Sequence, residues 1–136
     1  MNQSFAADFL LIIQDTLLKT GSARFRVVSN SMLPFIKNGD WIEVTMMNEN
    51  SSLKIGDIIL YRRPKDFLLH RIVKMTDDLI WTKGDRNRII DVPIKRSEVI
   101  AKLIKIQKNN TWFDMENPLM DIIHRSVGKI SYFLIR

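Results

Sequence analysis

The chain has 136 residues, of which 46% are hydrophobic and 26% are charged, so one domain with a substantial core is expected and wholesale disorder is excluded. The absence of cysteine excludes disulfides, thiolate chemistry and cysteine-based metal sites, and two histidines are too few for a dedicated metal cluster without carboxylates. The formal net charge of +6 favours polyanions or anionic membrane surfaces. The basic residues are nevertheless spread along the chain, without aromatic interleaving, so no nucleic-acid partner is expected.

The pattern of residues 4–20 predicts an amphipathic helix, because apolar side chains recur there at helical spacing. Asn2 or Ser4 can cap its start, and Gly21 can end it. We expect the helix to pack on the domain, with binding to a membrane surface or a partner as the alternative. The apolar stretch 9–13 is too short for a secretory signal, and no segment reaches the ~18 apolar residues of a membrane span. A cytoplasmic protein is therefore expected.

From about residue 24 the pattern changes to short runs rich in β-branched and aromatic residues, separated by Gly, Asn, Asp and Pro turn signals. The predicted strands are 25–28, 41–46, 58–62, 67–75, 79–82 and 99–107. Strands spaced so closely predict a mainly β fold, built as a compact coiled sheet or partial barrel.

The end of the chain predicts a second helix, which Asn117 can cap and Pro118 can begin. Its apolar stripe has Arg125, Lys129 and Arg136 on other faces. Such a helix can lie peripherally on an anionic membrane or pack against the rest of the protein, and the sequence leaves both open. We expect one domain over 1–136, with a helix in 1–22, a β core in 23–115 and a helix in 116–136.

Three polar elements interrupt the β core. The first is a Ser29-Asn30-Ser31 turn, which follows a strand and is stopped by Pro34. The second is His70 in the apolar strand 67–75, and the third is the polar loop Thr82-Lys83-Gly84-Asp85-Arg86-Asn87, followed by Asp91. Taken singly, they fit a turn-forming serine pair, a half-buried histidine and a solvated turn.

Together the three elements supply the groups of nucleophilic catalysis. A serine hydroxyl is a poor nucleophile until a neighbouring base takes its proton. Histidine suits that task, and a carboxylate can fix its tautomer and stabilise the imidazolium. Ser31, His70 and Asp91 could fill these roles, and their order in the chain has no bearing on geometry.

The same region resembles the type I signal peptidases, in the superfamily of serine endopeptidases that also includes the SOS-repressor proteases. The matching segments, in the order of the family's boxes, are Ser29-Asn30-Ser31-Met32-Leu33-Pro34 with Gly39-Asp40, then Gly56-Asp57-Ile58-Ile59, His70-Arg71-Ile72-Val73, Gly84-Asp85-Arg86-Asn87 through Asp91, and Ile100-Ala101-Lys102-Leu103. The resemblance covers roughly residues 25–106.

The resemblance implies Ser31 as nucleophile and His70 as general base, as in the endoplasmic-reticulum and archaeal type, where most bacterial members have lysine. It implies Asp91 as the functional aspartate and Ser29 as a hydroxyl that helps the Ser31 backbone N–H hold the oxyanion, with Asp85 as support. The implied activity is that of a serine endopeptidase cleaving a leader or signal-like peptide from a precursor, without metal or cofactor.

The chain departs from the family in three places. Asn30 and Ala101 stand where glycine is common, and no membrane anchor is visible, which favours a substrate on the cytoplasmic side. One alternative is a self-cleaving repressor-type domain, but that branch uses lysine as base and cleaves an Ala-Gly bond, and the chain contains no Ala-Gly. The other alternative is a non-catalytic module of the same fold that acts by binding a partner or membrane.

Overall fold

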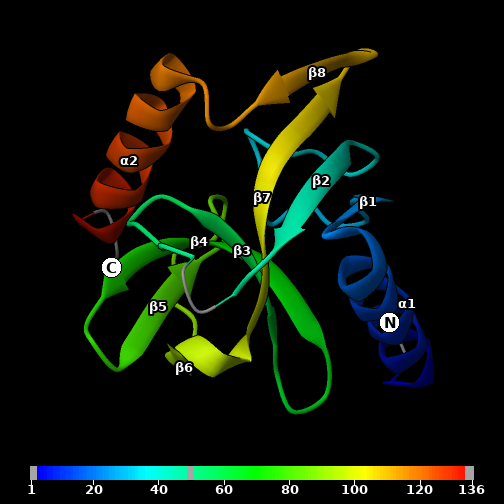
Figure 1. Ribbon diagram of the computed structural model, residues 1–136. Helices are drawn as coiled ribbons and strands as arrows, with labels where there is room; N and C mark the ends of the chain where they lie inside the picture. Colours follow the sequence, from blue (N-terminus) through cyan, green and yellow to red (C-terminus); the bar gives the residue numbers. More distant parts are fainter. Residues whose placement is uncertain (1–2, 49–50, 134–136) are drawn as a thin grey trace.

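The computed structural model describes residues 3–48 and 51–133 (Figure 1). The elements, in chain order, are α1 (Gln3–Thr20), β1 (Ser22–Arg26), β2 (Trp41–Met46), β3 (Ile58–Arg62), β4 (Phe67–Met75), β5 (Leu79–Lys83), β6 (Ile94–Lys95), the 3-10 turn Arg96–Glu98, β7 (Val99–Lys108), β8 (Thr111–Asp114) and α2 (Pro118–Phe133). The protein is mainly β, as the sequence predicts.

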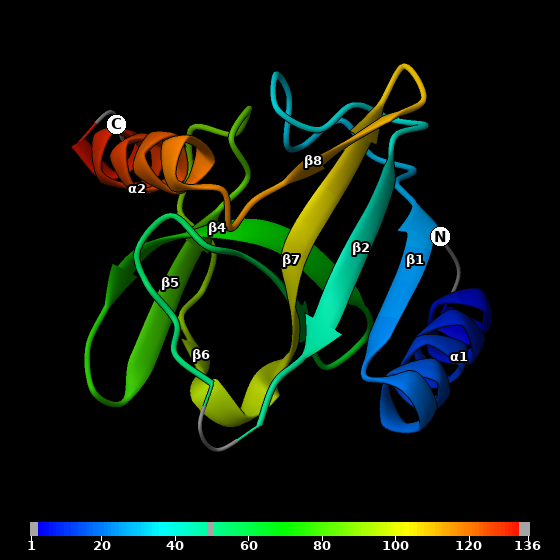
Figure 2. The same ribbon diagram turned by 45° about the horizontal axis from the view of Figure 1, so that its top comes forward.

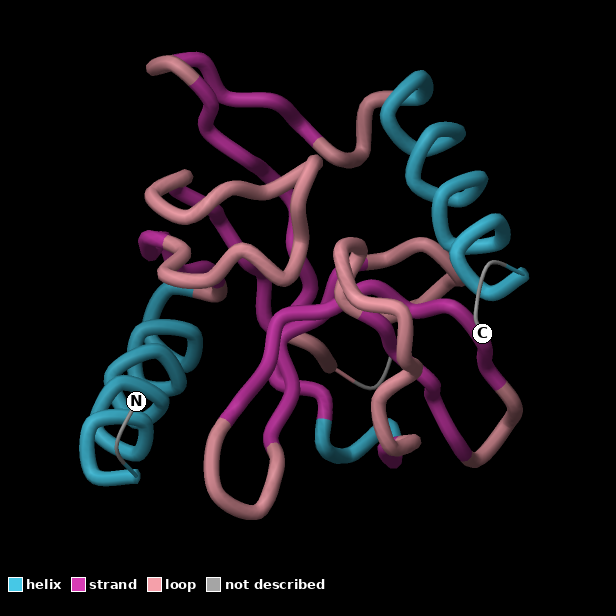
Figure 3. Tube along the Cα trace, turned by 180° about the vertical axis from the view of Figure 1, so that it is seen from behind, coloured by secondary structure: helices cyan, strands magenta, loops and turns pink. Residues whose placement is uncertain are grey.

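Within the described residues, eight strands form one antiparallel sheet in the order β1-β2-β7-β3-β4-β5-β6, and β8 pairs with β7. The sheet curls into a half-barrel (Figure 2). The two helices lie at opposite ends of it, which is also clear from behind (Figure 3). The strands β2, β3 and β4 have the predicted bounds. The short strands β6 and β8 were not predicted, because so few residues carry little periodicity.

The helix α1 ends where the sequence predicts. Gly21 has φ +79°, and its N–H donates to the carbonyl of Leu17 at 2.8 Å, which closes the last turn. Ile13 and Leu17 are buried in the main core beside β1 and β2, which confirms the expected packing for this face. Of the two residues proposed as caps, Asn2 lies outside the described residues.

Among the described residues, the buried apolar side chains form two clusters, one on each side of the curled sheet. The larger includes Ile13, Phe25, Met32 and Ile42 and continues onto β7. Alternate residues of β1 and β2 face it, as the two-residue period of a half-buried strand requires. The smaller cluster lies under β3, β4 and β5 and includes Tyr61. Both clusters hold the inner strands rigid where the polar elements emerge.

The helix α2 begins at the predicted cap, since the side chain of Asn117 accepts a hydrogen bond from the Leu119 N–H at 2.9 Å. It packs on the sheet through glycine against glycine: a Cβ on Gly128 would lie 2.6 Å from the backbone nitrogen of Gly56. Gly56 itself has φ +98°, which glycine adopts readily. The helix therefore packs against the body of the protein.

Buried polar contacts add to this packing. Arg125 on α2 pairs with Asp57 at 2.5 Å, and His124 accepts a hydrogen bond from Arg71 on β4 at 2.6 Å. The outward side of α2 still exposes Leu119, Ile122 and Ile130. In the part of the chain that the structure describes, neither helix is long and apolar enough to span a membrane.

Candidate functional site

The Ser29–Ser31 turn is held by the backbone on both sides. After β1, the Val27 N–H donates to the carbonyl of Asp40 at 2.9 Å, and its carbonyl accepts from the Gly39 N–H at 2.7 Å. The next side chain after Ser31, Met32, is 2% exposed and anchors the turn in the core. The Ser31 side chain is thereby held half-buried at the surface of a rigid turn.

Asn30, which stands where the family commonly has glycine, has a structural role here. Its side-chain oxygen accepts a hydrogen bond from the Asn38 N–H at 3.0 Å, and its carbonyl accepts one from the Leu33 N–H at 3.2 Å. The asparagine therefore ties the Ser31 turn to the following turn before β2. This departure leaves the position of Ser31 intact.

The structure brings Ser31, His70 and Asp91 together, although they come from a turn, a central strand and a loop. The Oγ of Ser31 lies 3.1 Å from Nε2 of His70, and Nδ1 of the same ring lies 2.5 Å from Oδ2 of Asp91. His70 is 3% exposed. With Asp91 ionised, Nδ1 of His70 carries the ring proton and donates a hydrogen bond to the carboxylate. Nε2 is then free to accept a hydrogen bond from the Ser31 hydroxyl.

Two hydroxyls to which the sequence analysis assigned no role also hold Asp91. Thr82 donates to Oδ2 of Asp91 at 2.8 Å, and the Tyr61 hydroxyl lies 3.2 Å from the same oxygen and 2.8 Å from Oγ1 of Thr82. Burial acts to raise the pKa of Asp91, but the hydrogen bonds from His70, Thr82 and Tyr61 outweigh it and lower the pKa below its usual value. The carboxylate is thus held ionised and fixed in direction.

Neither hydroxyl could be found from local pattern. Tyr61 lies in an apolar strand and is 1% exposed, as a core aromatic would be. Burial raises the pKa of this phenol, with the Asp91 carboxylate adding to the effect, so it stays protonated. The available signal for Thr82 was its place as the first residue of the polar loop, which did not indicate a contact with Asp91.

Ser29 lies against the nucleophile turn. Its Oγ accepts a hydrogen bond from the Ser31 N–H at 3.1 Å, and its hydroxyl can donate to Oγ of Ser31 at 3.3 Å. The hydroxyl and the N–H are the two donors that the family resemblance assigns to an oxyanion. They are adjacent, and here they are bonded to each other.

The loop 84–87 holds Ser31 from the other side. The Arg86 N–H donates to the carbonyl of Ser31 at 2.9 Å. Gly84 is packed so closely that a Cβ there would lie 2.8 Å from the Ser31 carbonyl oxygen and 3.0 Å from Nε2 of His70. The loop is fixed by Lys83, whose buried ammonium donates to the carbonyl of Gly84 at 3.0 Å and to that of Asn87 at 2.7 Å. Burial lowers the pKa of Lys83.

Asp85 lies in this loop but has its own partner. Its carboxylate accepts two hydrogen bonds from the buried guanidinium of Arg71, both at 2.8 Å. Arg71 also donates to the carbonyl of Gly56 at 2.9 Å and to His124 of α2. Asp85 therefore ties the loop to β4 and, through Arg71, to the C-terminal helix.

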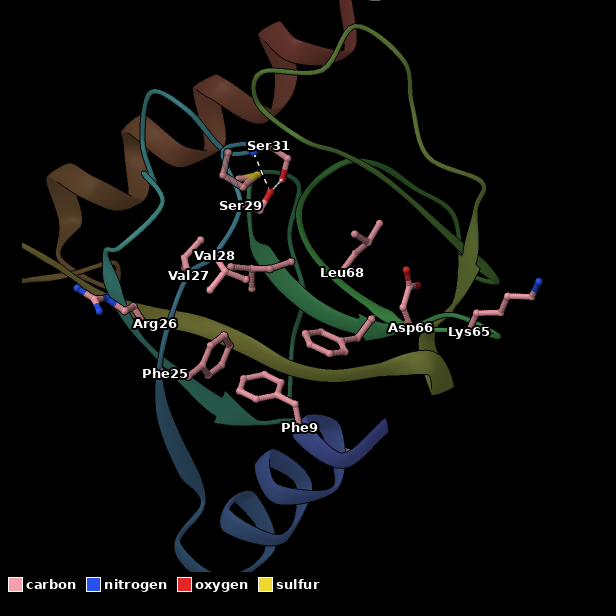
Figure 4. A pocket seen from close by; sticks show the side chains of 13 residues that line it. Phe9, Phe25, Arg26, Val27, Val28, Ser29, Ser31, Lys65, Asp66 and Leu68 are labelled. Atoms are coloured by element: carbon pink, nitrogen blue, oxygen red, sulfur yellow. Dashed lines mark hydrogen bonds between the residues drawn. The ribbon is translucent and has the colours of Figure 1, made fainter. Parts of the chain in front are cut away.

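A groove of about 500 Å³ opens beside Ser31, between the end of β1 and the start of β4. Ser29 and Ser31 lie at one end of it, and the rings of Phe9 and Phe25 lie at the other (Figure 4). Val28 and other apolar side chains line the middle. A hydroxyl bonded to a histidine thus stands at one end of an apolar groove, an arrangement that can carry out acyl transfer on a molecule bound there.

No family model matches the chain, and no curated protein matches it.

Proposed function

We propose that the protein is a serine endopeptidase that cleaves a leader or signal-like peptide from a precursor on the cytoplasmic side. The observation that carries the proposal is the continuous hydrogen-bond chain from Ser31 through His70 to Asp91. The 3.1 Å between Ser31 and His70 lies within the reach that proton transfer to a general base requires, and the 2.5 Å contact with Asp91 orients that base. The groove that begins at the same serine supports a substrate of peptide size.

The proposed reaction follows the serine acyl-transfer pattern. His70 accepts the Ser31 proton at Nε2 while Oγ bonds to the scissile carbonyl carbon, and Asp91 stabilises the imidazolium. The imidazolium then gives this proton to the leaving amine as the C–N bond breaks, which leaves an acyl group on Ser31. His70 then takes a proton from water while the water oxygen bonds to the acyl carbon. The proton returns to Oγ of Ser31 as the acyl group leaves, which restores the hydroxyl.

The oxyanion requires a small local change. The Ser31 N–H and the Ser29 hydroxyl would exchange their mutual hydrogen bond for bonds to the carbonyl oxygen of the substrate. Both donors already lie beside the nucleophile, so the change needs no movement of the sheet. Loss of one such donor costs ~100- to 1,000-fold in rate in other enzymes.

The strand edges beside the groove support an extended substrate. Among the described strands, β1 pairs only with β2, and the stretch 67–70 of β4 pairs only with β3, because β5 joins β4 from Arg71 onward. Val27 directs its backbone groups toward Gly39 and Asp40. Neighbouring residues of a strand direct theirs the opposite way. A peptide entering the groove can therefore pair as an added strand.

The proposal is tested by reaction of the folded protein with a serine-directed acylating probe, read by intact mass. We expect wild type to gain one probe mass, and Ser31→Ala and His70→Ala to gain none at the same time. Ser126→Ala is the matched control, because Ser126 is exposed on α2 and should leave labelling unchanged. Absence of labelling in folded wild type would overturn the proposal and favour a non-catalytic module that acts through a partner or membrane.

A further inference from the structure

The far end of the groove is closed by three aromatic rings from three different elements. Phe9 of α1 packs edge-on against Phe25 of β1, with ring centroids 5.5 Å apart, and stacks on Phe67 of β4 at 5.3 Å. All three rings line the groove, and those of Phe9 and Phe67 are only half-buried. We call this set the aromatic end. The N-terminal helix thus contributes directly to the wall of the groove that begins at Ser31.

We propose that the aromatic end is a subsite for a large apolar side chain, aromatic or branched aliphatic, about four or five residues before the scissile bond of the substrate. The inference rests on the proposed peptidase function and adds to it the chemical class of the substrate side chain that the protein recognises. It assigns Phe9 as a residue that determines specificity.

The spacing follows from the strand beside the groove. Phe25 and Ser29 are separated by four positions at and after the end of β1, which at ~3.3 Å per residue of extended chain span at most ~13 Å. A peptide paired along this edge spans the same distance per residue. When its scissile carbonyl lies at Ser31, its side chain about four or five residues away reaches the aromatic end.

The side chains that line the groove favour an apolar segment of the substrate. Between the two ends the groove is lined by Val27, Val28, Met32, Leu68 and Leu69. The charged lining residues in this groove are Arg26, Lys65 and Asp66, of which the first two are exposed. An anionic side chain at the aromatic end would lose hydration with no partner from the rings, whereas an apolar one gains by leaving water.

The direction of the peptide follows from the order of the reaction. The acyl half of the substrate stays bound to Ser31 while the amine half leaves and water takes its place. The half that must stay anchored is therefore the one that the long groove fits. This places the recognised side chain on the N-terminal side of the scissile bond.

The test compares two peptides that differ only at this position, with Phe or with Ser, scanned from about three to six residues before the scissile bond. Binding to Ser31→Ala is measured as a Kd, and cleavage by wild type as kcat/KM. We expect the Phe peptide to be preferred by about 10- to 100-fold at one of these positions in both measurements. Phe9→Ala should reduce that preference several-fold, and Leu11→Ala should leave it unchanged, since Leu11 is 64% exposed on the same helix.

The outcomes separate the two proposals. Failure of the acylating probe to label wild type overturns the peptidase function, while the Kd ratio still measures the subsite. Labelling at the normal rate without any Phe preference overturns the subsite alone. The substrate comparison in a Ser31→Ala background needs no change at Phe9, so it holds if Phe9→Ala fails to fold. A Phe preference that survives fully in folded Phe9→Ala would overturn the role of Phe9.

Discussion

The substitution Gly84→Ala should impair the candidate site while leaving the fold intact. The added Cβ would lie 2.8 Å from the carbonyl oxygen of Ser31 and 3.0 Å from Nε2 of His70, whereas ordinary contact begins at 3.4 Å. The backbone carbonyl and the braced ring must therefore give way by a few tenths of an ångström. Because the two groups lie on either side of the 3.1 Å Ser31–His70 hydrogen bond, that bond is expected to lengthen or bend.

The magnitude follows from the size of the displacement. Misplacement of reacting groups by 1 Å can cost ~100-fold in rate, so a shift of about half that size should cost ~10-fold. The rate of probe labelling and kcat/KM for a peptide should fall together. The free energy of unfolding, measured in urea, should fall as well, because the Ser31 carbonyl belongs to the backbone and moves only at a cost, although the third close neighbour, the amide of Asn87, is flexible.

A second glycine gives the matched control. A Cβ on Gly128 would lie 2.6 Å from the nitrogen of Gly56, at the contact between α2 and the sheet. Gly128→Ala should therefore lower the free energy of unfolding and leave the labelling rate of the folded protein unchanged. Labelling of Gly84→Ala at the wild-type rate would refute the reasoning, because it would show that the Ser31–His70 geometry tolerates displacement.

Two further predictions concern the carboxylate and the buried histidine of α2. Thr82→Val removes the 2.8 Å donor to Asp91, and we expect kcat/KM to fall by about 10-fold with KM little changed; equal activity would show that this hydroxyl does not position the carboxylate. Burial, with the charges of neighbouring arginines, lowers the pKa of His124 to about 4, so the unfolded chain binds a proton there before the folded protein does. The free energy of unfolding should therefore decrease by roughly 2 kcal/mol, after allowance for solvent screening, as the pH falls from about 6.5 to 4, and His124→Asn should lose this dependence; equal stability of wild type at pH 7 and 5 would contradict it.

Much of the β fold could be predicted from the sequence, for physical reasons that act locally. The strand 41–46 alternates between buried and exposed residues and is long enough for the pattern to be read. The end of α1 at Gly21 and the start of α2 at Asn117 follow from backbone rules that need no distant partner. β6 was missed because it spans two residues, and β8 because its four residues give little pattern.

The candidate site was predicted only in part. Ser31, His70 and Asp91 could be named because a hydroxyl, an imidazole and a carboxylate stood out from apolar surroundings. Thr82 and Tyr61 could not be given a role, because each fits the strand in which it lies. Only the pairing of β4 with both β3 and β5, together with the return of the chain at Asp91, brings both hydroxyls to the same oxygen.

What the sequence by itself determined was the type of each element and the polar groups available for chemistry, since both depend on neighbours in the chain. What only the tertiary structure decided was which distant groups meet. The sequence left the C-terminal helix open between a membrane surface and the rest of the protein, and the contact of Gly128 with Gly56 shows that one face of the helix packs on the body of the protein; a contact without side chains leaves no periodic signal in the sequence. It likewise gave Phe9 as one apolar residue of a helix, and only the curl of the sheet places that ring in the groove that leads to Ser31.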